Sequence, residues 1–312
     1  MSETKLILLC GSRIAIPVLR DLFFQQQLAA VVIPQHCSGF LQQVQLLLKD
    51  SNIPVITVNK NDFTETLNTS IRKYAPTMGL MFTFSYKLPE AIYKMPAKGF
   101  FNIHPGPLPA YRGPDPIFQQ IKNKEVYASV TIHKVDNEFD SGQVVLSDKI
   151  HLNVTDNYGI LTTKLSELAT RLVGTLVKMA GFDIEIPSRV QDNSKACYYK
   201  KQSAKDISID WNNMDAASIV ALIQACNPWN KGAVTKLNNN IIRLLDAYRV
   251  EHSPVKDSLP GTIISINEEG LTIAAANQET ICVTLVYNDE GFLLAGRLKA
   301  FGIIPGNRFE PI

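Results

Sequence analysis

The stretch Lys5-Leu6-Ile7-Leu8-Leu9-Cys10-Gly11-Ser12 decides how the first part of the chain folds. Residues 6–10 form an apolar run short enough for a buried β-strand, and Gly11-Ser12 marks a turn after it. Apolar side chains then recur at the spacing of a helix, at positions 14, 18, 19, 22 and 23. A strand, a tight turn and a helix in this order are the first step of an α/β arrangement.

The alternation of strand and helix continues to about Gly181. Further apolar runs predict strands at residues 29–33, 53–56, 77–84, 100–104 and 128–135. Helical periodicity predicts helices at residues 40–48, 62–74, 88–95 and 158–179. This order indicates an α/β fold with a doubly wound, mostly parallel, Rossmann-like sheet and helices on both of its faces.

The pattern changes after residue 182. Residues 183–206 are rich in Ser, Lys, Asn and Gln and have no periodicity, which is typical of a linker. A helix at 216–226 then precedes short β-rich runs separated by turn residues, at positions 232–237, 241–248, 261–266, 271–275 and 281–286. We therefore expect an α/β domain at residues 1–182, a linker at 183–206 and a smaller, OB-like β-barrel domain at 207–312.

Composition and charge narrow the class of protein. The chain is 46% apolar and 19% charged, as in an ordinary globular protein, and its net charge of +2 gives little general attraction to nucleic acid. The five cysteines are scattered and never form a C-x-x-C pair, which argues against disulfides and zinc and fits a reducing compartment. No apolar run reaches the length of a membrane span. We expect a cytoplasmic protein with no membrane partner and no metal.

Three polar residues stand where open α/β sheets bind their ligands. Asn102 and His104 are two residues apart at the end of a predicted strand, so their side chains point to the same face. The loop at residues 105–116 contains five prolines and two glycines, which makes it stiff and irregular. Asp140 follows the next predicted strand. Taken singly, these residues are equally explained as a capping Asn, a core His and a turn Asp, but the spaced set favours a reactive site.

The same residues carry a resemblance to a known family. The matching motifs are Asn102-Ile103-His104, Leu108-Pro109-x-Tyr111-Arg112-Gly113, Asp140-x-Gly142, Ile209-Asp210-Trp211, Asn227-Pro228-Trp229, Gly232-Ala233 and Pro260-Gly261-Thr262-Ile263. In this order they resemble the folate-dependent formyltransferases, which include enzymes acting on methionyl-tRNA, glycinamide ribonucleotide and amino-sugar nucleotides. The C-terminal motifs are similar to the β-barrel domain of the tRNA and sugar-nucleotide members, so the resemblance covers nearly the whole chain.

The resemblance implies an enzyme that moves a formyl group from 10-formyltetrahydrofolate, as a co-substrate, to an amine, with Asn102, His104 and Asp140 as catalytic residues. The amide of Asn102 and the ring of His104 would stabilise the oxyanion that forms when the amine attacks. Asp140 beside His104 would favour the imidazolium and direct the proton. No metal takes part in this chemistry.

The resemblance also implies binding residues. The donor would contact one segment at Tyr86, Lys87 and Leu88, and a loop at Val135, Asp136, Asn137, Glu138 and Phe139. The acceptor would contact Gly11, Ser12, Arg13, Tyr111, Arg112, Asp115 and His133. Ordinary structural explanations stay open for several of these residues: a tight turn at Gly11, a turn cap at Asp115 and a satisfied strand histidine at His133. The turn at Gly11 is not a G-x-G-x-x-G fingerprint, which argues against a nicotinamide cofactor.

The acceptor is less well defined than the reaction. Residues 34–43, where tRNA-acting members carry a basic loop, contain no Lys or Arg. Residues 203–312 hold nine Lys and Arg against twelve Asp and Glu, a net charge of −3, although tight tRNA binding needs several cations. We therefore favour a small-molecule or carrier-protein-bound amine, either an amino-sugar nucleotide or a carrier-bound aminoacyl group. Methionyl-tRNA formyl transfer is the alternative. A 10-formyltetrahydrofolate hydrolase and a non-catalytic folate-binding protein are less favoured.

Overall fold

The computed structural model describes residues 4–250 and 258–312. Within these residues the backbone forms two compact units. Among the described residues, unit 1 comprises 4–116, 127–150 and 162–199, and unit 2 comprises 117–126, 151–161, 200–250 and 258–312. The chain therefore passes between the units several times. The domain boundaries expected from sequence, at residues 182 and 207, stay a prediction about independently folding domains.

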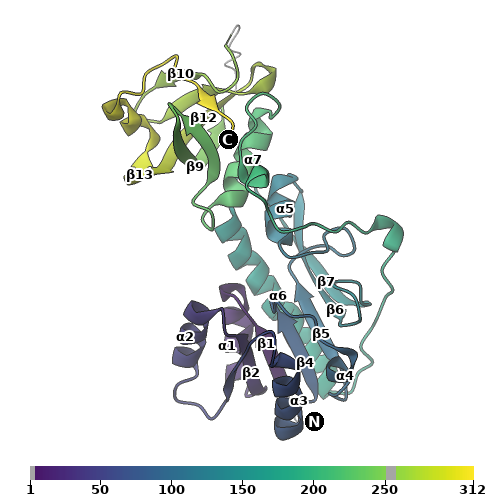
Figure 1. Cartoon of the computed structure of the whole chain (residues 1–312). Coiled ribbons are helices and arrows are strands. Elements are labelled where there is room, and N and C mark those ends of the chain that lie inside the picture. The colour runs from purple at the N-terminus through teal and green to yellow at the C-terminus, as the bar shows by residue number, and fades with distance from the viewer. Residues whose placement is uncertain (1–3, 251–257) are drawn as a thin grey trace. The chain divides into compact units, whose positions relative to one another are not determined.

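Unit 1 is built on a seven-stranded sheet (Figure 1). Its strands are β1 (Leu6–Cys10), β2 (Leu28–Pro34), β3 (Val55–Val58), β4 (Met78–Phe82), β5 (Phe100–His104), β6 (Tyr127–Lys134) and β7 (Val144–His151). They lie in the order β3-β2-β1-β4-β5-β6-β7; the first five are parallel, and β6 is antiparallel to β5. The predicted doubly wound, mostly parallel sheet is confirmed, and the return of β6 against β5 brings a second strand to the end of β5.

Helices cover this sheet. They are α1 (Ile16–Phe24), α2 (Ser38–Leu47), α3 (Phe63–Tyr74), α4 (Glu90–Tyr93) and α6 (Tyr158–Gly181), with a 3₁₀ turn at Arg13–Ala15. A buried apolar cluster joins alternate residues of β1 and β2, such as Ile7, Leu9 and Val32, to Leu67 of α3 and Ile92 of α4. Strand residues alternate between the two faces of a sheet, so this cluster fixes the face that α3 and α4 cover.

Strands β1 and β4 come close together just after their carboxyl ends. A side chain at Gly11 would place its Cβ 2.7 Å from the backbone oxygen of Thr83, so only glycine fits there. The hydroxyl groups of Ser12 and Thr83 lie 3.0 Å apart. Gly11 is thus explained by a close approach of two backbones at the sheet edge where parallel α/β folds bind ligands.

Unit 2 contains a curled antiparallel sheet. Its helices are α5 (Pro116–Lys122) and α7 (Ala216–Cys226), and its strands are β8 (Ala233–Leu237), β9 (Asn240–Arg249), β10 (Ile263–Ile266), β11 (Leu271–Ala274), β12 (Thr280–Asn288), β13 (Gly291–Leu294) and β14 (Phe309–Glu310). The path runs β10-β11-β12-β9-β8-β14, with β13 on β12. An isolated bridge between Thr262 and Arg308 joins the two ends of the path. The predicted C-terminal β-barrel is confirmed in this curled form.

A buried tryptophan organises the interior of unit 2. Trp211 is fully buried, stacks on Phe309 at 5.5 Å and donates from its indole nitrogen to Thr235 at 2.8 Å. Asp215 caps α7 by accepting from the backbone N–H of Ser218 at 2.7 Å. Among the described residues no helix combines the length and the apolar character needed to cross a membrane.

Candidate active site

The pairing of β5 with β6 determines the centre of the site. Asn102 pairs with His133 in the register of the two strands, and His104 pairs with Thr131. Residues opposite each other in an antiparallel pair point to the same face of the sheet, so the side chains of Asn102 and His133 are neighbours. The Asn102 amide nitrogen, Nδ2, lies 3.1 Å from His133 Nε2. The strand that the sequence predicted at 128–135 therefore contributes directly to the site.

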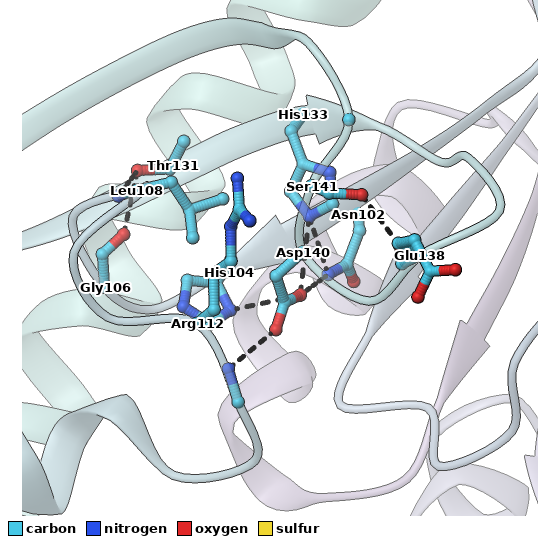
Figure 2. Close-up of polar contacts among 12 residues, drawn as sticks. Asn102, His104, Gly106, Leu108, Arg112, Thr131, His133, Glu138, Asp140 and Ser141 are labelled. Atoms are coloured by element: carbon cyan, nitrogen blue, oxygen red, sulfur yellow. Dashed lines mark hydrogen bonds and ion pairs between the residues drawn. The ribbon is translucent and has the colours of Figure 1, made fainter. Parts of the chain in front are cut away.

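The side chain of Asp140 is the point on which these residues converge (Figure 2). Its Oδ1 accepts from Asn102 Nδ2 at 3.2 Å, and its Oδ2 accepts from the backbone N–H of Gly113 at 2.9 Å. His104 Nδ1 lies 3.5 Å from Oδ1, and His133 Nε2 lies 3.6 Å from it. The structure thus brings the three predicted catalytic residues together and adds His133 and the Gly113 amide.

The hydrogen bonds of the two histidines define which ring nitrogen carries the proton. His104 Nε2 lies 2.6 Å from the carbonyl oxygen of Tyr111, which can only accept, so Nε2 carries a proton, and in the neutral ring it is Nδ1 that has the lone pair. His133 Nδ1 likewise donates to the carbonyl oxygen of Lys134 at 2.8 Å. Its Nε2 is then the acceptor for the Asn102 amide. Both rings are held in one orientation by backbone.

Burial and charge set the protonation of this group. His104 is only 4% exposed, and burial lowers its pKa below the ordinary value, although the charge of Asp140 opposes this shift. For Asp140, burial alone would raise the pKa. The electrostatic attraction of His104 and the hydrogen bonds to the carboxylate outweigh burial, and they lower the pKa of Asp140 to about 2. At neutral pH the site therefore holds an ionised Asp140 beside a neutral His104.

The loop that carries Asp140 has an unusual backbone. Asp140 has φ of 56°, in the left-handed region that most residues avoid. Two residues on, a Cβ at Gly142 would lie 1.8 Å from the carbonyl oxygen of Lys134, so glycine is required. Asp136 accepts from the backbone N–H of Glu138 at 3.1 Å and from the hydroxyl of Ser141 at 2.8 Å. The loop is therefore held from within.

Sequence reasoning missed Gln191, which lies in the stretch assigned to a linker. Its side chain is 7% exposed and its amide nitrogen donates to the backbone oxygens of Asp140 and Gly142. Its amide oxygen accepts from Arg112. Neither periodicity nor composition marks this residue, because its partners are mainly backbone groups about fifty positions away in the chain.

A cavity of about 750 Å³ lies beside the Asp140 loop. It is lined by Arg112, Asp136, Glu138, Phe139, Ser141, Asn193, Ala196, Cys197 and Tyr198. Asp140 itself is not among these residues, but its neighbours on both sides are. Phe139 presents an apolar ring that is 48% exposed. The size of the cavity is in the range of sites for cofactors and other small molecules.

The predicted donor-binding residues form two adjacent segments. Lys87 lies 4.0 Å from the carboxylate of Glu138 and 5.9 Å from the ring centre of Phe139, so the segment at 86–88 meets the loop at 135–139. Leu88 is 2% exposed and belongs to the apolar core, and Tyr86 and Val135 pack against the same core. Asn137 accepts from the hydroxyl of Tyr93 at 3.0 Å. Their roles in donor binding stay a prediction.

The predicted acceptor-binding residues do not all lie together. Tyr111 is buried and stacks on Tyr199 with ring centres 5.3 Å apart, while Arg112 lines the cavity. Asp115 is partly buried and directly precedes α5. Gly11, Ser12 and the exposed Arg13 lie at the end of β1, where the hydroxyl of Ser12 is 3.0 Å from that of Thr83. Whether these residues bind the acceptor stays a prediction.

Within residues 4–250 and 258–312 no group of three or more His, Cys, Asp or Glu side chains is arranged to hold a metal ion.

Comparison with known proteins identifies the family. Residues 29–176 match the family described as formyl transferase, and residues 201–294 match the formyl transferase C-terminal domain. The methionyl-tRNA formyltransferase of Kosmotoga olearia is 30% identical over 235 residues, which are 74% of this chain and 73% of that protein. The chain belongs to the folate-dependent formyltransferase family, whose members use 10-formyltetrahydrofolate as the formyl donor, and it is an enzyme of formyl transfer.

Solved structures share the fold. An N-formyltransferase from Helicobacter canadensis, in complex with folinic acid and dTDP-3-aminofucose, superposes with a TM-score of 0.69 at 17% identity, over 90% of this chain and 98% of that chain. HypX from Aquifex aeolicus superposes with a TM-score of 0.66 at 18% identity over 95% of this chain. The chain spans 48% of the HypX chain, about half its length. At these identities the likeness concerns the fold alone.

Proposed function

We propose that this protein transfers the formyl group of 10-formyltetrahydrofolate to a primary amine of an acceptor other than tRNA, an amino-sugar nucleotide or a carrier-bound aminoacyl group. The observation that carries the chemistry is the convergence of Asn102 and His104 on one carboxylate, that of Asp140. An amide donor, a neutral imidazole and a fixed negative charge are the groups that transfer of an acyl group to an amine requires.

The donor site is proposed at the cavity beside the Asp140 loop. Its volume of about 750 Å³ suits a molecule the size of a reduced folate, and Phe139 offers an apolar ring against which a flat heterocycle packs. Arg112 provides a cation for a carboxylate. The bound 10-formyltetrahydrofolate supplies the formyl carbon that the amine attacks. Asp136, Glu138 and Phe139 form one wall of the cavity, and the segment 86–88 contacts this loop through Lys87.

Asn102 is the proposed donor to the negative charge that develops on the formyl oxygen. One such donor is worth about 3 kcal/mol of the activation barrier. Both N–H bonds of Asn102 are occupied in the resting site, toward His133 at 3.1 Å and Asp140 at 3.2 Å. One of them must be exchanged when the substrate binds. The bond to His133 also fixes the orientation of the amide, with its nitrogen on the side of Asp140.

His104 is the proposed acceptor of the amine proton. Its neutral ring has a lone pair on Nδ1, since Nε2 donates to the carbonyl of Tyr111. Once protonated, the ring lies between that carbonyl and the carboxylate of Asp140, and both interactions favour the imidazolium. Burial keeps the ring uncharged before the reaction, and Asp140 stabilises the charge only after the proton arrives. This difference between the two states is what lowers a barrier.

The choice of acceptor rests on charge. The connection between β2 and α2 is Gln35–Cys37, three residues without Lys or Arg. The part of the chain from Ser203 carries a net charge of −3. Tight tRNA binding depends on Lys and Arg at several phosphates, so both features speak against tRNA as the acceptor. The similarity to the methionyl-tRNA formyltransferase of Kosmotoga olearia supports the alternative acceptor, methionyl-tRNA.

A turnover assay tests both parts of the proposal. Purified protein is given 10-formyltetrahydrofolate with an amino-sugar nucleotide, an aminoacyl carrier protein or charged initiator tRNA, over a series of salt concentrations. Formylation of a non-tRNA amine, with a rate that changes little with salt, supports it. Efficient, salt-sensitive formylation of the tRNA overturns the choice of acceptor. Release of formate at an undiminished rate without any acceptor would indicate a hydrolase instead.

Matched variants separate the chemistry from the choice of acceptor. Asn102→Ala removes the proposed oxyanion donor and should lower kcat by about 100-fold with every acceptor. Replacing the exposed Lys200 and Lys201 by Glu should leave turnover of a non-tRNA amine unchanged. If tRNA is the acceptor, the double lysine variant should instead weaken tRNA use and flatten its salt dependence.

A further inference from the structure

Gln191 is buried in a segment whose other side chains are exposed or only partly buried. Between residues 181 and 199, a stretch rich in polar residues, it is the only one whose side chain is buried, at 7% exposure. A buried amide must find partners for its oxygen and for both hydrogens, and this one does. Its nitrogen donates to the backbone oxygen of Asp140 at 2.8 Å and to that of Gly142 at 2.7 Å.

The oxygen of the same amide binds Arg112, a residue that lines the cavity. It accepts from Arg112, from Nη2 at 2.8 Å and from Nε at 3.2 Å. The residue after Arg112 is Gly113, whose backbone N–H donates to the carboxylate of Asp140. One side chain therefore joins the loop that carries Asp140 to the loop that supplies a hydrogen bond to it.

The backbone conformation of Asp140 is one that needs hydrogen bonds from its surroundings to persist. Its φ of 56° is unfavourable for a residue with a side chain, and it persists only where the surroundings determine it. Gln191 holds the backbone oxygen of Asp140 itself and that of Gly142, two residues on. These two bonds fix the backbone of the loop and so the orientation of the Asp140 side chain.

We propose that Gln191 is a positioning residue, which holds the Asp140 carboxylate at His104 and Asn102 during formyl transfer. The proposal rests on the proposed function, because it assumes that Asp140 acts in the reaction. It does not make Gln191 a catalytic residue, since all the bonds of its side chain go to the protein.

The segment that carries Gln191 is held in place without its side chain. Arg189 and Val144 exchange two backbone hydrogen bonds of 2.8 Å. Further along, the backbone N–H of Arg112 donates to the carbonyl of Cys197 at 3.0 Å, and that of Tyr199 donates to the carbonyl of Arg112 at 2.9 Å. Replacement of Gln191 therefore alters the support of the Asp140 loop and leaves the segment docked.

Two substitutions and a control test the proposal in the full-length protein. Gln191→Met keeps the length of the side chain and removes all its strong hydrogen bonds. Gln191→Glu keeps an oxygen for Arg112 and places a second oxygen against the two backbone carbonyls. Each should lower kcat about 10- to 100-fold, the size expected for a misplaced reactive group, with KM for both substrates within about threefold. Ser194→Ala, which removes only a bond to Asp192 on the same segment, is the control and should leave kcat unchanged.

A double variant shows whether Gln191 acts through Asp140. In an Asp140→Asn background, Gln191→Met should change kcat by less than about twofold. A protein that lacks the carboxylate cannot lose further activity through misplacement of that carboxylate. Losses that multiply, or a rise of KM with kcat intact, would overturn the proposal. Thermal unfolding is followed in parallel, and Gln191→Glu carries the test if Gln191→Met does not fold. Full activity of Asp140→Asn alone would instead refute the proposed function.

Discussion

Replacement of Asp140 by Asn is the most informative single change in this site. The amide has nearly the shape of the carboxylate and keeps one oxygen that can accept from the N–H of Gly113, now 2.9 Å from Oδ2. It has no charge. The change therefore removes the electrostatic interaction with His104 and leaves most of the packing of the loop intact.

The distance between Asp140 and His104 gives the size of the effect. Oδ1 lies 3.5 Å from His104 Nδ1, and two unit charges at this separation interact by about 5 kcal/mol with an effective dielectric constant of about 20. The interaction exists only when His104 is protonated, so it lowers the barrier and not the energy of the resting site. Tenfold in rate corresponds to about 1.4 kcal/mol, so kcat should fall by about 10³-fold.

Steady-state turnover with the best acceptor provides the measurement. We expect kcat of Asp140→Asn to fall while KM for the donor and the acceptor stays within a few-fold, because the lost interaction belongs to the transition state. Circular dichroism and thermal unfolding check that the protein is folded. A kcat within tenfold of the unchanged protein, in a folded variant, would refute the assignment of His104 as the proton acceptor supported by Asp140.

Three further outcomes follow from the same geometry. Because burial lowers the pKa of His104 and the base must be neutral, kcat should rise with pH and reach half of its maximum below pH 6.5; a midpoint above pH 7 would contradict this. Asp140 has a pKa of about 2 in the folded protein against 3.8 ordinarily, so its contribution of about 2 kcal/mol to stability is complete above pH 3.8 and is lost as pH falls toward 2. Acid unfolding of Asp140→Asn should lack this component, and an unchanged acid transition would count against it. Gly142→Ala should lower both Tm and kcat, since its Cβ would lie 1.8 Å from the carbonyl oxygen of Lys134, and wild-type values for both would show that the loop can move aside.

The parts of the fold that could be predicted are those with strong periodicity. The buried strands β1, β2 and β4 consist almost wholly of apolar residues, and α7 was predicted at the observed residues, Ala216–Cys226. The strand β7, Val144–His151, was missed because only its first two side chains are buried, while Leu146 and Ile150 are partly buried and the other four are exposed at an edge of the sheet. An edge strand of this kind has no alternation to detect.

The site shows the same division between local and distant information. Asn102 and His104 could be assigned to one face because a spacing of two on a strand has one geometric meaning, and both side chains do reach Asp140. Asp140 itself could be placed only by its position after a strand and by the resemblance. The hydrogen bond between Asn102 and His133 depends on the register of β5 and β6, which the sequence does not specify.

The support of Asp140 explains why part of the motif is visible in the sequence and part is not. The glycine of Asp140-x-Gly142 is required by a collision with backbone, so it appears as a fixed residue type beside the Asp. The hydrogen bonds from Gln191 end on backbone oxygens, which every residue possesses, so they constrain no residue type in the loop. A carboxylate held by an amide from a segment without periodicity therefore emerges only when the chain is folded. The same reasoning predicts that Gln191 tolerates no apolar substitute while its exposed neighbours on the segment tolerate many.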